Sequence, residues 1–308
     1  MYRILALDGG GVRGLLTVIL LERLEAALPP PGLVARADLL AGTSTGALIA
    51  LALARGIPLA TLRELYLRRA REVFDDSWLD DLRDLGRLAG AEYSNRGLRR
   101  IAREWFGEAT LGDLPKAVLV PTFDLDNEDP DPRRRSWKPK LFHNVPGTDA
   151  DRAVPLAGLA LYATAAPTYF PSAEGYIDGG VYANNPAMCA LAQSQDPRNA
   201  VRPPLDSVAL LSLGTGRNLE YLRGRRHDWG FAQWARPLIS LMLDGTVGIA
   251  DYQCRQLLGE RYHRLAPAFP PGLRIGMDEI RRLPELGRFA EALPIDDTVV
   301  WLRRWWAG

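Results

Sequence analysis

Short apolar runs alternate with longer amphipathic runs along the first two thirds of the chain. Apolar runs a few residues long are typical of buried strands, and four are expected at residues 4–7, 38–41, 116–123 and 208–213. Apolar residues at helical spacing predict helices at residues 15–28, 47–54, 59–74 and 98–105. Strands that alternate with helices form a mostly parallel sheet covered on both faces, so the pattern predicts a three-layer α/β/α fold.

The composition adds two limits to this picture. The chain has 308 residues, of which 47% are hydrophobic and 24% charged, as is typical of a globular protein. We expect a single domain at residues 1–308, with a motif-bearing core at about 1–216 and a less diagnostic extension at 217–308. The 38 basic and 37 acidic residues give a net charge of +1, so no overall field would draw the protein to nucleic acid.

The cysteines and the start of the chain predict a cytoplasmic protein. Cys189 and Cys254 have neither metal-ligand nor redox spacing and are expected to be free thiols. A candidate motif already begins at Asp8, which leaves no room for a signal peptide before it. The longest apolar stretch, residues 39–54, is too short and too interrupted to span a bilayer. We therefore expect a cytoplasmic location and only peripheral contact with membranes.

A Gly-x-Ser-x-Gly sequence at residues 42–46 lies between a predicted strand and a buried helix. At such a position the serine occupies a tight turn, and Gly42 and Gly46 let the strand and the helix approach each other closely. The hydroxyl of Ser44 would then lie at the amino end of the helix, where negative charge is stabilised. Ser44 is therefore a candidate nucleophile.

Three consecutive glycines, Gly9 to Gly11, follow the first predicted strand. Their unhindered N–H groups can converge on an anionic oxygen, as an oxyanion hole requires. The same loop also satisfies a dinucleotide-binding pattern, because Gly14 stands at the third glycine position of that pattern. Asp8 would place a carboxylate near the pyrophosphate of such a ligand. The sequence therefore favours an oxyanion hole, with a nucleotide-binding module as the alternative.

A nucleophilic serine needs a base, and the sequence offers two candidates. His263 follows Ser44 in the order that a Ser-Asp-His esterase of the α/β-hydrolase type requires, but too few strands precede Ser44 for that fold. Asp178 ends an apolar run and precedes Gly179 and Gly180, which leave the space around it open. A carboxylate is a weak base for a hydroxyl, so this choice depends on a dry site and a well-stabilised oxyanion.

Three motifs in this order resemble the signature of the patatin-like phospholipases. They are the glycine loop at residues 8–14, the serine turn at 42–46 and the Asp-Gly-Gly sequence at 178–180, and the resemblance extends through roughly the first 216 residues. It implies that Ser44 is the nucleophile and Asp178 its base. It further implies an oxyanion hole made by the N–H groups of Gly10, Gly11 and Val12. The motifs also contain the supporting residues Gly9, Arg13, Gly14, Gly42, Gly46, Gly179 and Gly180.

The resemblance implies a lipid acyl hydrolase that cleaves fatty acyl esters of glycerophospholipids, or of another acyl-ester lipid, through an acyl-serine intermediate. Such chemistry needs neither a metal nor an organic cofactor. A weaker resemblance, at residues 257–264, links the chain to patatin-like effectors of bacterial anti-phage defence, whose lipase activity is switched on by cyclic dinucleotides. A cyclic-dinucleotide activator is therefore an open alternative.

Three of the eight tryptophans lie close to the carboxyl terminus, beside two arginines. Aromatic and cationic side chains together suit a lipid interface. The other interpretation is a tail that packs over the protein's own apolar surface, and we favour it. The residues concerned are Trp301, Arg303, Arg304, Trp305 and Trp306.

Overall fold

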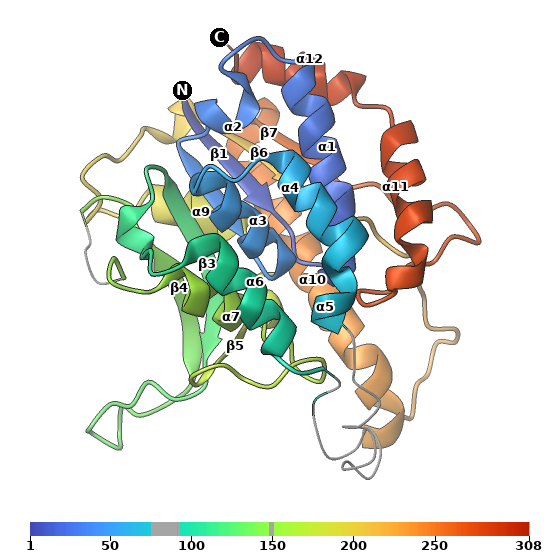
Figure 1. Cartoon of the computed structure of the whole chain (residues 1–308). Coiled ribbons are helices and arrows are strands. Elements are labelled where there is room, and N and C mark those ends of the chain that lie inside the picture. Colours follow the sequence, from blue (N-terminus) through green and yellow to red (C-terminus); the bar gives the residue numbers. More distant parts are fainter. Residues whose placement is uncertain (75–90, 92, 148–150, 308) are drawn as a thin grey trace.

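A computed structural model of the chain describes residues 1–74, 91, 93–147 and 151–307 (Figure 1). Its centre is a seven-stranded sheet in the order β4-β3-β2-β1-β6-β7, with β5 also paired to β3. β1, β2, β3, β6 and β7 run parallel, whereas β4 and β5 are antiparallel to β3. The strands are β1 (Tyr2–Leu7), β2 (Leu39–Gly42), β3 (Ala117–Asp124), β4 (Lys138–His143), β5 (Tyr176–Asp178), β6 (Val208–Leu213) and β7 (Tyr262–Leu265).

Alternate residues of each strand bury themselves on opposite faces of the sheet, as the two-residue period of a strand requires. In β1, Leu5 and Leu7 pack with the larger of two core clusters and Ile4 and Ala6 with the smaller one. The larger cluster holds α1 (Gly14–Ala26), α2 (Gly32–Arg36), α3 (Thr45–Ala54), α4 (Leu59–Glu64), α5 (Ala70–Phe74), α6 (Arg96–Phe106), α7 (Leu156–Thr164), α11 (Leu283–Ala292) and α12 (Asp296–Trp305). The smaller cluster holds α9 (Ala187–Ser194) and the end of α10 (Phe231–Leu258).

The predicted three-layer fold is confirmed, with two local differences. The sheet is mixed at one edge, because β4 and β5 both run antiparallel to β3. The single helix expected at residues 59–74 is divided into α4 and α5 by a π-helical turn at Leu65–Arg69. Such turns are common beside functional sites, and this one places Leu65 and Tyr66 in the wall of a pocket.

Residues beyond 216 contribute to the same sheet and core. β7 pairs in parallel with β6, and α11 packs against α1. Within the described residues, no helix combines the length and the apolarity that a bilayer crossing requires.

The tryptophan-rich tail packs onto the protein itself, as the favoured interpretation expected. Trp306 is fully buried, and its indole N–H donates to the carbonyl of Leu33 at 2.9 Å. Trp301 stacks on the ring of His263 and donates to the carbonyl of Glu260 at 2.7 Å. The tail is therefore part of the hydrophobic core.

Trp306→Ala is expected to lower the free energy of unfolding by about 3 kcal/mol, because it leaves a large cavity and an unpaired carbonyl at Leu33. Urea unfolding followed by circular dichroism measures this loss. Val300→Ala, which changes an exposed side chain of α12, the helix that Trp306 follows, is the control and should leave the midpoint nearly unchanged. Equal midpoints for Trp306→Ala and the wild type would contradict the packing role.

Candidate active site

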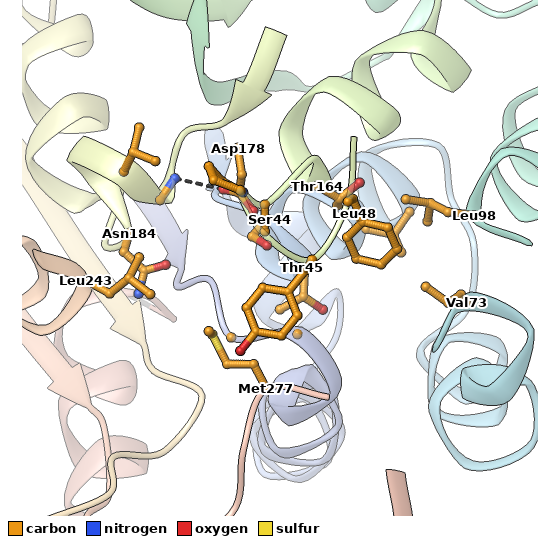
Figure 2. Close-up of a pocket in the computed structure, with 18 of the residues that line it drawn as sticks. Ser44, Thr45, Leu48, Val73, Leu98, Thr164, Asp178, Asn184, Leu243 and Met277 are labelled. Atoms are coloured by element: carbon orange, nitrogen blue, oxygen red, sulfur yellow. Dashed lines mark hydrogen bonds between the residues drawn. The ribbon is translucent and has the colours of Figure 1, made fainter. Parts of the chain in front are cut away.

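Ser44 lies at the turn between β2 and α3 in a backbone conformation that is unusual for a residue with a side chain. Its φ is 55° and its ψ is −125°, and it is the residue that precedes the first turn of α3. Positive φ at a non-glycine residue costs of the order of 1–3 kcal/mol and persists only where the surrounding structure enforces it. The strained turn places Ser44 in the lining of a pocket, directly before the amino end of α3 (Figure 2).

The flanking glycines allow the close packing that holds this turn. A Cβ at Gly42 would overlap the backbone of Gly46, and a Cβ at Gly46 would overlap the carbonyl of Leu7. The Gly46 N–H donates to the carbonyl of Thr43 at 2.8 Å, which closes the turn around Ser44. Strand, turn and helix are therefore in backbone contact, as the Gly-x-Ser-x-Gly spacing predicts.

Asp178 ends β5 and is fixed from both its backbone and its side chain. Its N–H donates to the carbonyl of Ala165 at 3.0 Å, and its Oδ1 accepts the N–H of Gly180 at 2.7 Å (Figure 2). Gly179 packs so closely on Pro121 that a Cβ would overlap the proline carbonyl. The carboxylate is consequently buried, with 4% of its residue surface exposed.

The structure brings Ser44 and Asp178 together. Ser44 and Asp178 line one pocket (Figure 2). Burial raises the pKa of Asp178 from 3.8 to about 6, although Ser44 and the hydrogen bond from the Gly180 N–H act in the opposite direction. The Thr43 hydroxyl donates to the Ala183 carbonyl at 2.6 Å and ties the serine turn to the segment that follows Asp178.

The glycine loop after β1 lies beside Ser44 and contributes two glycines to the lining of the pocket. Gly10 and Gly11 line the pocket with Ser44, and within the described chain no acceptor is recorded for their N–H groups. The Val12 N–H donates to the carbonyl of Met277 at 2.7 Å. In this conformation the Val12 N–H is therefore taken by Met277, whereas those of Gly10 and Gly11 have no acceptor within the described residues.

Arg13 supports this loop from behind. Its Nε donates to the carbonyl of Gly10 at 3.4 Å, a long hydrogen bond that bears on the peptide unit whose N–H belongs to Gly11. Gly9 is fixed too, because its N–H donates to the carbonyl of Asn184 and its own carbonyl accepts the Thr215 hydroxyl. Gly14 leaves room for Thr45 and Tyr66, whose hydroxyls hydrogen-bond to each other.

The pocket above Ser44 is lined mainly by apolar side chains and has a cavity volume of about 160 Å³. Its walls come from the serine turn and α3, from the π-helical turn and α5, from α6, from the loop after α7, and from α10 (Figure 2). An apolar chamber with one hydroxyl, one carboxylate and two free backbone donors can take a hydrocarbon chain with an ester at its polar end. The apolar lining includes Leu48, Leu65, Val73, Leu98, Phe170, Val181, Met242, Leu243 and Met277.

No histidine lines this pocket in the described part of the chain. His263 lies on β7, where its Nε2 is 2.9 Å from the Thr298 hydroxyl and its ring stacks on Trp301. The structure therefore does not bring His263 to the pocket of Ser44, as the alternative triad requires, and places it in the packing of α12 instead.

His263→Gln is expected to leave kcat/KM for a soluble acyl ester within about twofold of the wild-type value, because glutamine keeps a polar partner for Thr298 and the serine site is untouched. Initial rates with p-nitrophenyl butyrate measure this. A thermal unfolding curve recorded in parallel separates any loss of folded protein from a loss of turnover. A much larger loss of kcat/KM in fully folded protein would reinstate a role for the histidine.

The nucleotide-binding alternative does not fit the observed loop. The N–H groups of Gly9, Val12 and Arg13 are bonded within the protein, and Gly10 and Gly11 line the pocket above Ser44. Asp8 is buried and paired with Arg264, at 2.5 Å between Oδ2 and Nη2. Most polar groups of the glycine loop are thus already bonded within the protein and are not available to a dinucleotide.

Several pocket residues had no signal in the sequence. Met277 comes from an irregular segment after β7, yet its carbonyl accepts the Val12 N–H and its side chain lines the pocket. Met242 and Leu243 come from α10, about 200 residues from Ser44. Only the fold brings these segments to the serine, and no local spacing predicts that.

Comparison with known proteins gives consistent matches. Residues 5–191 match the family model described as patatin-like phospholipase. A cGAMP-activated phospholipase of Pseudomonas aeruginosa is 33% identical over 86% of this chain and 78% of its own length. A putative sporulation hydrolase of Bacillus subtilis is 30% identical over 87% of this chain and 88% of its own length. Patatin-like protein 1 of Oryza sativa subsp. indica is 29% identical over 80% of this chain and 68% of its own.

Among solved structures, VipD of Legionella pneumophila matches with a TM-score of 0.46 and 12% identity, over 99% of this chain and 67% of that one.

Proposed function

Because the chain belongs to the patatin-like phospholipase family, we propose that it cleaves the fatty acyl esters of glycerophospholipids through an acyl intermediate on Ser44. The observation that carries this proposal is that Ser44 and the buried carboxylate of Asp178 line the same largely apolar pocket, where Ser44 also favours the ionised form of that carboxylate. A pKa of about 6 leaves that carboxylate largely ionised at neutral pH and makes it a stronger base than an exposed aspartate.

In the first half of the reaction, the Ser44 oxygen attacks the ester carbonyl and its proton passes to Asp178. The carbonyl oxygen becomes an oxyanion, which accepts hydrogen bonds from the N–H groups of Gly10 and Gly11. The positive end of the α3 dipole adds to this stabilisation. When the tetrahedral intermediate collapses, the bond to the alcohol breaks and the alcohol leaves with the proton from Asp178.

In the second half, water attacks the acyl carbon of the ester on Ser44. Asp178 takes one proton from this water, and the same two backbone donors hold the new oxyanion. Collapse breaks the bond to Ser44, which recovers its proton from Asp178, and the fatty acid is released. Each half returns the site to its starting protonation state, so this dyad needs no histidine.

The test is product identification with phospholipid substrate. Vesicles of phosphatidylcholine and phosphatidylglycerol are incubated with the wild-type protein and with Ser44→Ala as the blank, and the lipids are analysed by mass spectrometry. Free fatty acid and the matching lysophospholipid should accumulate in equal amounts only with the wild type. No release from any lipid by folded wild-type protein would refute the proposed function.

We further propose that a cyclic dinucleotide activates the enzyme, a second candidate property that rests on the relative named a cGAMP-activated phospholipase. That relative spans most of this chain at 33% identity. Fatty acid release from phosphatidylglycerol vesicles, measured with and without cyclic GMP–AMP, tests the idea. Equal rates over a panel of cyclic dinucleotides would count against it.

The proposed substrate lies in membranes, and α10 offers a surface that suits peripheral contact with them. Several large apolar side chains of α10 are exposed, and at about 100° per residue they fall on one face of the helix. Met242 belongs both to this face and to the lining of the acyl pocket, so the face is continuous with the pocket. We propose that this apolar α10 face rests on a cytoplasmic lipid surface. Its members are Leu238, Leu241, Met242, Ile249 and Tyr252.

Leu241→Glu is expected to weaken binding to phosphatidylglycerol vesicles about tenfold or more, because it places a charge on the face that would enter the lipid and would meet an anionic surface. Vesicle co-sedimentation measures the binding. Val300→Glu introduces the same charge at an exposed apolar position on α12, which lies at the opposite end of the molecule from the first turns of α10 (Figure 1). Equal effects of the two variants would contradict a role for the α10 face.

A further inference from the structure

A second cavity, of about 640 Å³, lies at the carboxyl ends of β1, β6 and β7. The chain leaves β1 toward β2 on one side, whereas β6 is followed by β7 on the other side, so the crevice between β1 and β6 is the switch point of this sheet. Ligands of open α/β sheets bind at such points. Asn184 lines both this cavity and the acyl pocket and separates the two. We call this space the switch-point cavity.

Most acidic groups around the switch-point cavity already have a cation as partner. Asp8 pairs with Arg264, Glu220 with Arg274 and Asp251 with Arg255. Arg13 and Arg217 also line the cavity. Within the described residues, neither of these two arginines forms an ion pair. Asp244 is likewise unpaired there, and partial burial raises its pKa despite the opposing influence of both arginines. The lining carries four acidic side chains and four arginines, so its formal charge is zero, but Arg13 and Arg217 are left without an ion pair within the described residues and can take an anion.

We propose that the switch-point cavity binds a phosphate ester, whose anionic phosphate takes the guanidinium groups of Arg13 and Arg217. Arginine presents paired N–H donors that match two oxygens of a phosphate. The volume lies within the range of small-molecule sites, about 300–1,000 Å³. Asp244 accepts a hydroxyl or an N–H of the ester group, and the exposed ring of Tyr221 supplies an aromatic face.

This site is in direct contact with the glycine loop. Arg13 donates to the carbonyl of Gly10, and Thr215 of the cavity wall donates to the carbonyl of Gly9 at 2.8 Å. A Cβ at Gly10 would overlap the Thr215 side chain, so the glycine loop packs directly against the wall of the cavity. A phosphate that draws Arg13 toward the cavity changes the orientation of the Gly10–Gly11 peptide and with it the oxyanion donors. This regulatory consequence rests on the proposed function, whereas the binding site does not.

Binding is measured by calorimetry on the full-length Ser44→Ala protein, so that no probe is hydrolysed. The soluble probes are cyclic GMP–AMP and inorganic phosphate, and the lipid probe is a phosphatidylglycerol vesicle. Arg217→Gln is expected to weaken binding of cyclic GMP–AMP about tenfold or more, because it removes one charged donor pair. Arg225→Gln is the matched control, since Arg225 is exposed in the same polar segment and does not line the cavity.

Each outcome decides one point. Arg217-dependent binding of a soluble probe supports the site, and Arg217-dependent binding of vesicles alone also supports it but identifies a lipid headgroup as the source of the phosphate. No binding of any probe, or equal losses in Arg217→Gln and Arg225→Gln, overturns the site. Wild-type hydrolysis of p-nitrophenyl butyrate with and without the bound probe tests the coupling, and binding with an unchanged rate overturns it. Failure of the proposed hydrolysis would leave the calorimetric result standing, so the two failures are distinguishable.

Discussion

Ser44→Ala is expected to lower the turnover of acyl esters by at least about a thousandfold, because it removes the hydroxyl that would form the acyl intermediate. The hydroxyl that is removed belongs to the residue that lines the pocket together with Asp178. The neighbouring hydroxyl of Thr45 is hydrogen-bonded to Tyr66 and is not directed to the carboxylate. The Gly10 and Gly11 donors stay in place, so the residual rate measures what the loop alone contributes.

Two measurements check this prediction. Initial rates with p-nitrophenyl butyrate give the loss of turnover, and intact-protein mass spectrometry after treatment with a fluorophosphonate shows whether the serine is nucleophilic. The wild type should gain one adduct, and Ser44→Ala should gain none. Ser136→Ala, which removes an exposed hydroxyl, is the control and should be labelled like the wild type. Labelling of Ser44→Ala at the wild-type rate would show that another residue is the nucleophile.

The central strands were predictable from the sequence because they are buried on both faces and read as continuous apolar runs. β6 was expected at residues 208–213 and is observed there, with every residue buried. β4 carries lysines and a proline and is exposed at its start, so its sequence has no such run. β5 and β7 are only three and four residues long, which is too short for a periodic pattern to appear.

The chemistry of the candidate site was also local enough to be predicted in part. The Ser44 turn and the glycine loop each depend on a few nearby glycines, at which a Cβ would overlap neighbouring atoms. The sequence could not predict that the Val12 N–H is already hydrogen-bonded, because its acceptor is the carbonyl of Met277, which lies 265 residues further along the chain. The switch-point cavity was hidden for the same reason, since its walls come from the ends of three strands and from α10.

Asp178→Asn is expected to lower turnover by about a hundred- to ten-thousandfold, because the amide cannot accept the proton of Ser44.

The same change, Asp178→Asn, should stabilise the folded protein at neutral pH. The folded pKa of Asp178 is raised from 3.8 to about 6, so the folded state holds this proton more tightly than the unfolded state does. The raised pKa therefore adds to the free energy of unfolding of the wild type below pH 4. This contribution, about 3 kcal/mol, is lost as the pH rises through 6. Asparagine has no charge to bury and avoids that loss.

Thermal unfolding of Asp178→Asn and the wild type between pH 4 and pH 8 measures the effect on stability. The variant should melt higher at pH 7 to 8, and the difference should shrink toward pH 4. Asp206→Asn makes the same change at an exposed position and should show no such trend.

In the wild type, kcat/KM should fall about tenfold per pH unit below 6, because the protonated carboxyl cannot act as the base. A kcat/KM that stays constant down to pH 4.5 in folded protein would remove Asp178 from the proton transfer, whatever the stability curves show.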